Sequence, residues 1–325
     1  MSASCADTMA RALCAVLLVC VAAASAATLH ARALNNRPVI GVLSQEVSPT
    51  VAGIYGNHSS YIAASYVKFL EGAGARVVPI MIAQNSSYYK DVVSRINGVL
   101  FPGGATYFDN QQGYADAGAI LFSLAEQLNA RGDYFPLWGT CLGFELITYL
   151  AAGRREHRAW CDSENEMLPL DFKPDFAESR LFKSASKEVI KILSTENVTP
   201  NFHHWCITEK NMTKFGLSED WRVMSTNKDS DGFEFVSTIE SRSRPFYATM
   251  FHPEKIGYEW KEKHRTPHDA HAVLTMQYFA DFFVNEARKS SHKFSPNGEI
   301  ELIYQYQPTY TGNRTIYQQL YFFNY

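Results

Sequence analysis

The feature that most constrains the fold is an alternation of apolar runs and helical segments between residues 38 and 153. Four apolar runs, each bounded by turn residues, are predicted to be buried strands at 38–43, 75–82, 97–104 and 134–140. The predicted helices between and after them span 59–74, 88–96, 114–131 and 142–153. Strands that alternate with helices are typical of βαβ units. We therefore predict an α/β protein with a doubly wound, mostly parallel central sheet and helices on both faces.

Two glycine-containing turns follow strands of this predicted sheet. One is Phe101-Pro102-Gly103-Gly104, and the other begins at Gly139, where the fourth strand ends. Ligands of open α/β sheets bind beyond the carboxyl ends of the strands. We therefore expect both turns to lie at the same rim of the sheet and to face one site.

The second turn holds a cysteine between two glycines, in the order Gly139-Thr140-Cys141-Leu142-Gly143. The same spacing around serine marks a nucleophile elbow, a sharp turn from a strand into a helix. The positive end of the following helix would favour the thiolate form of Cys141. The sequence therefore predicts a nucleophile here, although a buried cysteine that only fills space is the common alternative.

A cysteine nucleophile needs a base, and the base needs a group that orients it. His252 follows an apolar strand and precedes Pro253 and Glu254. Histidine can take the thiol proton and later return it to a leaving amine. The carboxylate of Glu254 would reach around the proline turn and hold the ring, because proline fixes the chain there.

The rest of the chain is less regular. A helix is expected at 178–194, strands at 201–208, 222–227, 232–241 and 244–254, and a long helix at 269–290. The aromatic tail, residues 300–310 and 315–325, is expected to form either an added pair of strands or an interface. Because no linker or repeat interrupts the chain, we predict one catalytic domain over residues 27–325.

Residues 1–26 have the pattern of a cleaved signal peptide, with an apolar run followed by Ala24-Ser25-Ala26. Secretion would agree with five glycosylation sequons, at Asn57, Asn85, Asn197, Asn211 and Asn313. We expect no membrane anchor, because no other segment approaches the length of a membrane span. A net charge of −3 does not favour nucleic acid as a partner.

Six cysteines are present, and three of them, Cys5, Cys14 and Cys20, would leave with the signal peptide. Of the remaining three, at least one has no partner within the chain. A disulfide between Cys161 and Cys206 would leave Cys141 free; this pairing is a hypothesis. No metal or other cofactor is expected, because the histidines lack the spacing of known metal motifs such as H-E-x-x-H.

These motifs resemble the class I glutamine amidotransferase fold, a flavodoxin-like architecture, and more closely the gamma-glutamyl hydrolase family of cysteine peptidases. The resemblance spans Pro38 to the C-terminus, including "YFPLWGTCLGFE", "NFHHW" and "FHPEK". It implies a secreted or lysosomal homodimer that cleaves folylpolyglutamates. It also implies a set of site residues: a triad of Cys141, His252 and Glu254, an oxyanion hole from Leu142 and the Gly103-Gly104 turn, and substrate contacts from Tyr66 and His203.

Glu145 stands where glutamine amidotransferases commonly carry glutamine. Its carboxylate is predicted to receive the α-ammonium of a glutamyl group, or else to be a helix-start glutamate favoured by the helix dipole. His203 is chosen over His204 by alignment with the family, and strand neighbours point to opposite faces.

The predicted reaction is acyl transfer, in which Cys141 attacks a γ-carbonyl and His252 protonates the departing glutamate amine. Water would then release the γ-glutamyl product from a thioester acyl-enzyme. Two alternatives remain open at this point. One is a glutaminase or amidotransferase-type amide hydrolase acting on free glutamine, and the other is a non-enzymatic glycoprotein that keeps the fold for binding.

Overall fold

The computed structural model describes residues 34–295 and 301–325, and Asn35–Tyr325 form one compact unit. An eight-stranded sheet runs through the unit described here. Its strand order is β3 (Arg76–Ile80), β1 (Val39–Leu43), β4 (Val99–Phe101), β5 (Leu137–Thr140), β11 (Phe246–Thr249), β10 (Glu234–Ser241), β9 (Trp221–Lys228) and β7 (Asp171–Phe172). β3, β1, β4, β5 and β11 are parallel to one another, and the pairings of β11 with β10, β10 with β9, and β9 with β7 are antiparallel. The prediction of a mostly parallel α/β sheet is confirmed.

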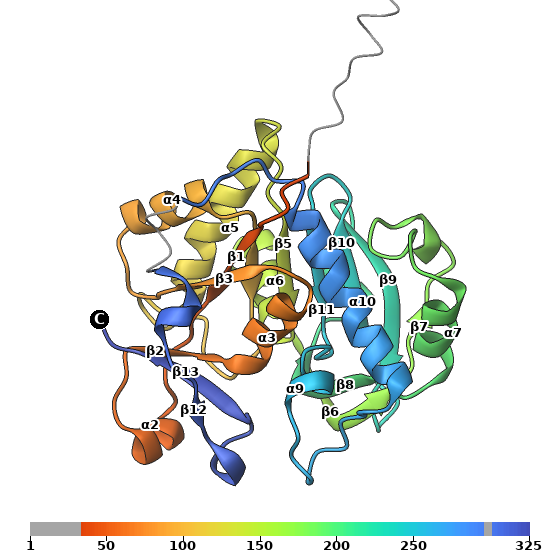
Figure 1. Ribbon diagram of the computed structural model, residues 1–325. Coiled ribbons are helices and arrows are strands. Elements are labelled where there is room, and N and C mark those ends of the chain that lie inside the picture. Colours follow the sequence, from red (N-terminus) through yellow and green to blue (C-terminus); the bar gives the residue numbers. More distant parts are fainter. Residues whose placement is uncertain (1–33, 296–300) are drawn as a thin grey trace, which may run out of the picture. The chain divides into compact units, whose positions relative to one another are not determined.

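Helices cover both faces of this sheet (Figure 1). Val39 and Leu43 of β1 pack in one core with α4 (Ser86–Arg95), α5 (Tyr114–Ala130) and α6 (Leu142–Ala151). Ile40 and Val42 pack in a second core with α3 (Ala64–Gly72), α7 (Lys187–Thr195) and α10 (Ala270–Ala287). Successive strand residues point to opposite faces, so a continuous apolar strand supplies both cores.

Two expected helices begin later than the sequence predicts. Residues 60–63 form β2 (Ser60–Ala63), which pairs with the C-terminal strand β13 (Gln319–Phe323), and β13 pairs with β12 (Thr309–Tyr310). The start of the expected helix at 59–74 is therefore a strand, because the tail supplies its partner. The aromatic tail does form a pair of strands. In the expected 178–194 helix, α7 begins only after Ser186, whose side chain accepts from the Val189 N–H.

A separate two-stranded antiparallel sheet joins β6 (Ala159–Leu168) to β8 (Thr199–Cys206). Cys161 and Cys206 form a disulfide between these strands. The proposed pairing is confirmed, and among the described residues Cys141 is the only free cysteine. The sequence did not predict β6, β7, or the shorter elements α2 (Pro49–Tyr55), α8 (Glu209–Lys214), α9 (Lys255–Tyr258), η1 (Phe176–Glu178), η3 (Ile303–Gln305) and η4 (Gly312–Arg314).

The predicted signal peptide and its cleavage site lie outside the described residues. Within residues 34–295 and 301–325, no helix combines the length and the apolar character that crossing a bilayer requires.

Candidate active site

Cys141 lies at a sharp turn between β5 and α6. Its backbone has φ 51° and ψ −109°, a conformation that costs free energy for any residue other than glycine. The flanking glycines make the turn possible. A Cβ on Gly139 would lie 2.5 Å from the Gly143 carbonyl oxygen, and one on Gly143 would lie 2.0 Å from the Phe101 carbonyl oxygen. The Gly-x-Cys-x-Gly pattern therefore lets β4, β5 and α6 approach each other closely.

The cysteine and the histidine meet beside the Gly103 turn. A Cβ built on Gly103 would lie 3.1 Å from Cys141 Cβ and 2.7 Å from His252 Cε1. The carboxyl ends of β4 and β5 thus meet at one rim, as predicted from the two glycine turns, and the residue that follows β11 and its next turn, His252, lies there too. Two backbone bonds fix this arrangement: the Cys141 N–H donates to the Thr249 carbonyl at 2.9 Å, and the His252 N–H donates to the Pro200 carbonyl at 2.8 Å.

His252 is oriented by two buried side chains. Its Nδ1 lies 2.7 Å from Glu254 Oε1 and 3.3 Å from the Tyr66 hydroxyl. The Tyr66 oxygen also accepts from the Gly103 N–H at 2.8 Å. A carboxylate at Nδ1 holds the ring hydrogen there, which leaves the Nε2 lone pair of neutral His252 available to a thiol.

Burial sets the protonation of this pair. It raises the pKa of the Cys141 thiol well above its usual range, and the nearby Glu145 carboxylate raises it further. The Leu142 N–H at the start of α6 lowers the pKa of the thiol, but burial outweighs it. Burial also lowers the pKa of His252, against the opposing effect of Glu254. The helix end thus favours the thiolate as expected, but burial has the larger effect on the pKa of the thiol.

The Gly103-Gly104 turn is held by a residue that the sequence analysis missed. The amide Nε2 of Gln45 donates to the Pro102 and Gly103 carbonyls, at 3.1 and 3.0 Å. A Cβ on Gly104 would lie 1.8 Å from Gln45 Oε1, so the turn and this side chain are in close contact. The Gly103 N–H is already bonded to Tyr66. Gln45 follows the carboxyl end of β1. This position at the rim of the sheet is the sequence signal that could have pointed to Gln45.

Glu145 lies buried in the first turn of α6 and forms an ion pair that the sequence did not predict. Its Oε2 lies 2.7 Å from Arg158 Nη1. Burial raises the pKa of Glu145 to about 7, and Arg158 opposes that rise. Arg158 also binds Glu156, and its guanidinium lies over the rings of Phe108 and Trp205.

His203 lies on β8 against the disulfide, with Nδ1 3.4 Å from Cys206 Sγ and Nε2 3.1 Å from Asn201 Oδ1. Burial lowers the pKa of His203 to about 3, and a positive charge on the nearby His252, whenever that ring is protonated, would lower it further. His204 faces the other way, with its ring stacked on Trp160 at 5.0 Å. The prediction that the two histidines point to opposite faces is confirmed.

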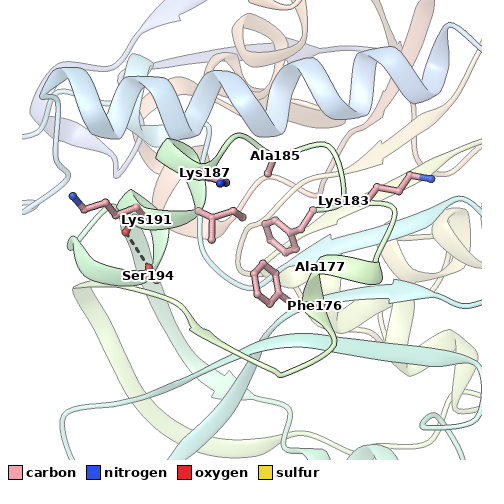
Figure 2. A pocket seen from close by; sticks show the side chains of 9 residues that line it. Phe176, Ala177, Lys183, Ala185, Lys187, Lys191 and Ser194 are labelled. Carbon is pink, nitrogen blue, oxygen red and sulfur yellow. Dashed lines mark hydrogen bonds between the residues drawn. The ribbon is translucent and has the colours of Figure 1, made fainter.

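The site residues are nearly enclosed. Cys141 retains 4% and His252 3% of their exposed area, so both residues are almost completely buried. A different surface hollow, of about 400 Å³, is formed by η1, α7 and the segment between them. Figure 2 shows the side chains that line it. Phe176 and Phe182 line its wall, together with several lysines. None of the predicted site residues lines this hollow.

The five sequons do not share one environment. Asn211 is half-buried, and its side-chain amide donates to the His157 carbonyl at 2.6 Å. The other four asparagines, at 57, 85, 197 and 313, are exposed. Glycosylation of each remains a prediction.

Comparison with known proteins agrees with this geometry. The Peptidase C26 family model matches residues 38–254. The chain is 42% identical over 311 residues to gamma-glutamyl hydrolase of Homo sapiens, covering 95% of this chain and 96% of the relative. It is 40% identical to gamma-glutamyl hydrolase B of Dictyostelium discoideum, covering 90% and 84%. It is 34% identical to gamma-glutamyl hydrolase 1 of Arabidopsis thaliana, covering 86% and 80%. The chain belongs to the Peptidase C26 family of cysteine peptidases.

Proposed function

We propose that this chain is a cysteine hydrolase that cleaves γ-glutamyl peptide bonds, those of folylpoly-γ-glutamates among them. The observation that carries this proposal is the convergence of Cys141 and His252 on Gly103, with Glu254 bonded to His252. A strained elbow, a neutral imidazole and an orienting carboxylate are the parts that acyl transfer requires. The name shared by the relatives supports the choice of bond.

In this mechanism the His252 imidazole takes the Cys141 proton as the sulfur attacks the γ-carbonyl. Transfer during attack suits the resting state, because burial disfavours a preformed thiolate. The imidazolium then faces the Glu254 carboxylate at 2.7 Å, which stabilises its charge. His252 next protonates the departing glutamate amine, and the thioester remains. Water, deprotonated by His252, releases the acyl group and restores the thiol.

The developing oxyanion needs donors that are in place before attack. We assign the Leu142 N–H, at the start of α6, as one donor. The Gly103-Gly104 turn supplies the other in this proposal. Since the Gly103 N–H is bonded to Tyr66, either that bond is exchanged during the reaction or the Gly104 N–H serves. Removing one such donor typically costs a factor of about 10²–10³ in kcat.

The decisive experiment incubates the purified chain with folylpolyglutamates and identifies the products by mass. We expect shortened folates and released glutamate or oligoglutamate, and no activity in Cys141→Ala. Ammonia release from free glutamine, with polyglutamates untouched, would instead indicate the glutaminase alternative. Full hydrolysis by folded Cys141→Ala would place the chemistry at another site. Absence of all hydrolysis by the folded wild-type chain would leave only the binding role.

We also propose that the chain follows the secretory route to lysosomes or the exterior. The Cys161–Cys206 disulfide and the four exposed sequons support this, because both are features of secreted proteins. Glycosidase treatment followed by peptide mapping tests it, and unmodified asparagines at all five sequons in a chain purified from its natural source would contradict it.

We propose a homodimer as well. The C-terminal segments leave large apolar side chains exposed, at Tyr304, Tyr310, Ile316 and Tyr325, and such groups are enriched at interfaces. Sedimentation equilibrium tests the assembly, and Tyr310→Arg is expected to shift it toward monomer. A monomer over the whole micromolar range would contradict the proposal.

A further inference from the structure

The Cys161–Cys206 disulfide is in contact with a third potential ligand. His203 Nδ1 lies 3.6 Å from Cys161 Sγ and 3.4 Å from Cys206 Sγ. The three ligand atoms all lie within 4.8 Å of one another, and all three residues are buried. This cluster plays no part in the acyl-transfer steps above.

We propose that, when the disulfide is reduced, Cys161, Cys206 and His203 form a binding site for Zn²⁺. Two thiolates and one imidazole are a donor set that zinc accepts, with a fourth position left to water. Zinc binds sulfur at about 2.3 Å and imidazole nitrogen at about 2.0–2.1 Å, which puts tetrahedral sulfur and nitrogen ligands about 3.5 Å apart. The two nitrogen–sulfur separations already match that spacing. Only the two sulfurs have to move apart.

The histidine is held in the form that binds a metal. The side-chain amide of Asn201 donates to the Thr199 carbonyl at 2.9 Å, which turns its oxygen toward His203. Nε2 of His203 lies 3.1 Å from that oxygen and donates to it. The hydrogen of the neutral ring therefore sits on Nε2, and the Nδ1 lone pair faces the sulfurs. An outer partner of this kind is the usual support of a metal-bound histidine.

The strands allow this convergence because their pairing is irregular. β6 and β8 pair antiparallel, with Ala159 opposite Cys206 and Ser163 opposite His203, and the register shifts between Trp160 and Ser163. That irregularity brings Cys161 into contact with both His203 and Cys206 of β8. The sequence shows no familiar metal spacing here, because His203 and Cys206 lie on one strand and Cys161 lies 42 residues before His203.

The chemistry balances with a dithiol as reductant. Thiol–disulfide exchange breaks the Cys161–Cys206 bond, gives each sulfur one electron and one proton, and leaves the reductant as a cyclic disulfide. Zn²⁺ then displaces the two thiol protons and binds two thiolates and the neutral His203 Nδ1. Oxidation of the two thiolates back to a disulfide would release the metal.

The test uses Cys141→Ala, because the free thiol of the candidate active site would also bind zinc. In the oxidised variant we expect no specific uptake. After reduction with a dithiol and its removal under anaerobic conditions, two free thiols and one bound metal per chain are expected. Co²⁺ serves as the spectroscopic probe, because thiolate ligands give it charge-transfer absorption, and Zn²⁺ should displace it.

Matched variants separate this site from adventitious binding. In the same background, Cys206→Ser should abolish the thiolate–Co²⁺ spectrum of the two-thiolate site. Asn201→Ala should weaken Zn²⁺ binding by about 10–100-fold, the usual effect of losing an outer partner. His204→Ala, which alters the outward-facing neighbour, should bind as the background does.

If the reduced chain, with two free thiols confirmed, binds neither Co²⁺ nor Zn²⁺, the proposal is wrong. A spectrum and affinity unchanged by His203→Ala overturn it as well. If reduction abolishes the near-ultraviolet circular dichroism of the folded chain, adding Zn²⁺ is expected to restore it. Failure of that recovery would also contradict the site.

Discussion

His252 Nδ1 lies 2.7 Å from Glu254 Oε1, and a single residue, Pro253, separates the two along the chain. Glu254 has helical backbone angles and precedes α9, so the chain folds back on the imidazole immediately after the proline. The His252 N–H is bonded to Pro200, which anchors the other side of this turn. The proposed base and its orienting group thus form one local unit, whereas the nucleophile comes from a different strand.

Glu254→Gln should keep the shape of this unit and remove its charge. The amide can present its NH₂ group to Nδ1, which would favour the tautomer with hydrogen on Nε2 and leave no lone pair for the thiol. We expect kcat to fall by a factor of about 10³–10⁴, the scale seen when the orienting carboxylate of a triad is neutralised. Steady-state kinetics check this, with a thermal melt as the folding control. A loss below tenfold in a folded variant would exclude an orienting role.

Tyr66→Phe should impair hydrolysis through two lost bonds. The hydroxyl accepts from the Gly103 N–H and contacts His252 Nδ1, so its removal frees a buried donor and loosens the imidazole. Because the imidazole is then held less precisely, we expect kcat/KM to fall by about tenfold or more. Tyr114→Phe is the matched control, because its hydroxyl bonds the Pro102 carbonyl of the same turn without touching His252. Equal losses in both variants would assign Tyr66 a purely structural role.

Gly103→Ala should disable the site with a methyl group. The new Cβ would lie 2.7 Å from both His252 Cε1 and the Tyr66 hydroxyl, so the imidazole or the turn has to move. A displacement of about 1 Å at reacting groups costs about 10²-fold in rate. Gly53→Ala is the control, since no atom lies within 4 Å of its added Cβ. Unchanged kcat/KM in Gly103→Ala would contradict the convergence at this turn.

The strand–helix alternation and the rim position of Cys141 could be predicted from the sequence because both follow from local patterns. Apolar runs with glycine punctuation specify β1, β4 and β5, and G-x-C-x-G needs only neighbouring residues to make an elbow. The orienting pair was equally accessible, because Glu254 lies two residues from His252. Such features depend on short-range geometry, which periodicity reports directly.

The contacts that tune the site could not be predicted in this way, because they join distant segments. Arg158, the residue before β6, forms an ion pair with Glu145. Gln45 is bonded to a turn 57 residues further along the chain. Local pattern does not distinguish β2 from the start of a helix, because its partner β13 lies at the far end of the sequence. The raised pKa of the Cys141 thiol likewise depends on burial by the complete fold, which outweighs the helix end.

Acid should destabilise the folded chain through His157. Burial lowers the pKa of His157 to about 4, below its usual value of about 6.5. The unfolded chain therefore binds a proton before the folded chain does. The contribution of His157 to the free energy of unfolding is complete above pH 6.5. It is lost as the pH falls toward about 4, and the loss is roughly 3 kcal/mol. Urea unfolding at pH 7 and pH 5 should give a smaller loss for His157→Gln than for the wild type. Equal losses would show that His157 does not contribute.

Glu145 should discriminate between substrates by the charge on the α-nitrogen of the γ-glutamyl residue. Free glutamine and N-terminal γ-glutamyl peptides carry an α-ammonium, whereas the same nitrogen inside a folylpolyglutamate chain is acylated and neutral. If the Glu145 carboxylate receives that nitrogen, Glu145→Gln should lower kcat/KM about 10–100-fold for the ammonium substrates, which is the effect of losing a charged hydrogen bond. The loss for acylated substrates should remain below tenfold.

The ion pair with Arg158 makes a matched control necessary. Glu145 Oε2 is bonded to Arg158, so Glu145→Gln also leaves that guanidinium with one partner fewer. Glu156→Gln removes the other, exposed carboxylate from Arg158 while Glu145 stays intact. Rates measured with γ-glutamylglutamate and its N-acetyl form separate the two effects. Equal losses on both substrates in Glu145→Gln would mean that the carboxylate acts only by holding Arg158, because a direct contact has to sense the charge of the substrate nitrogen.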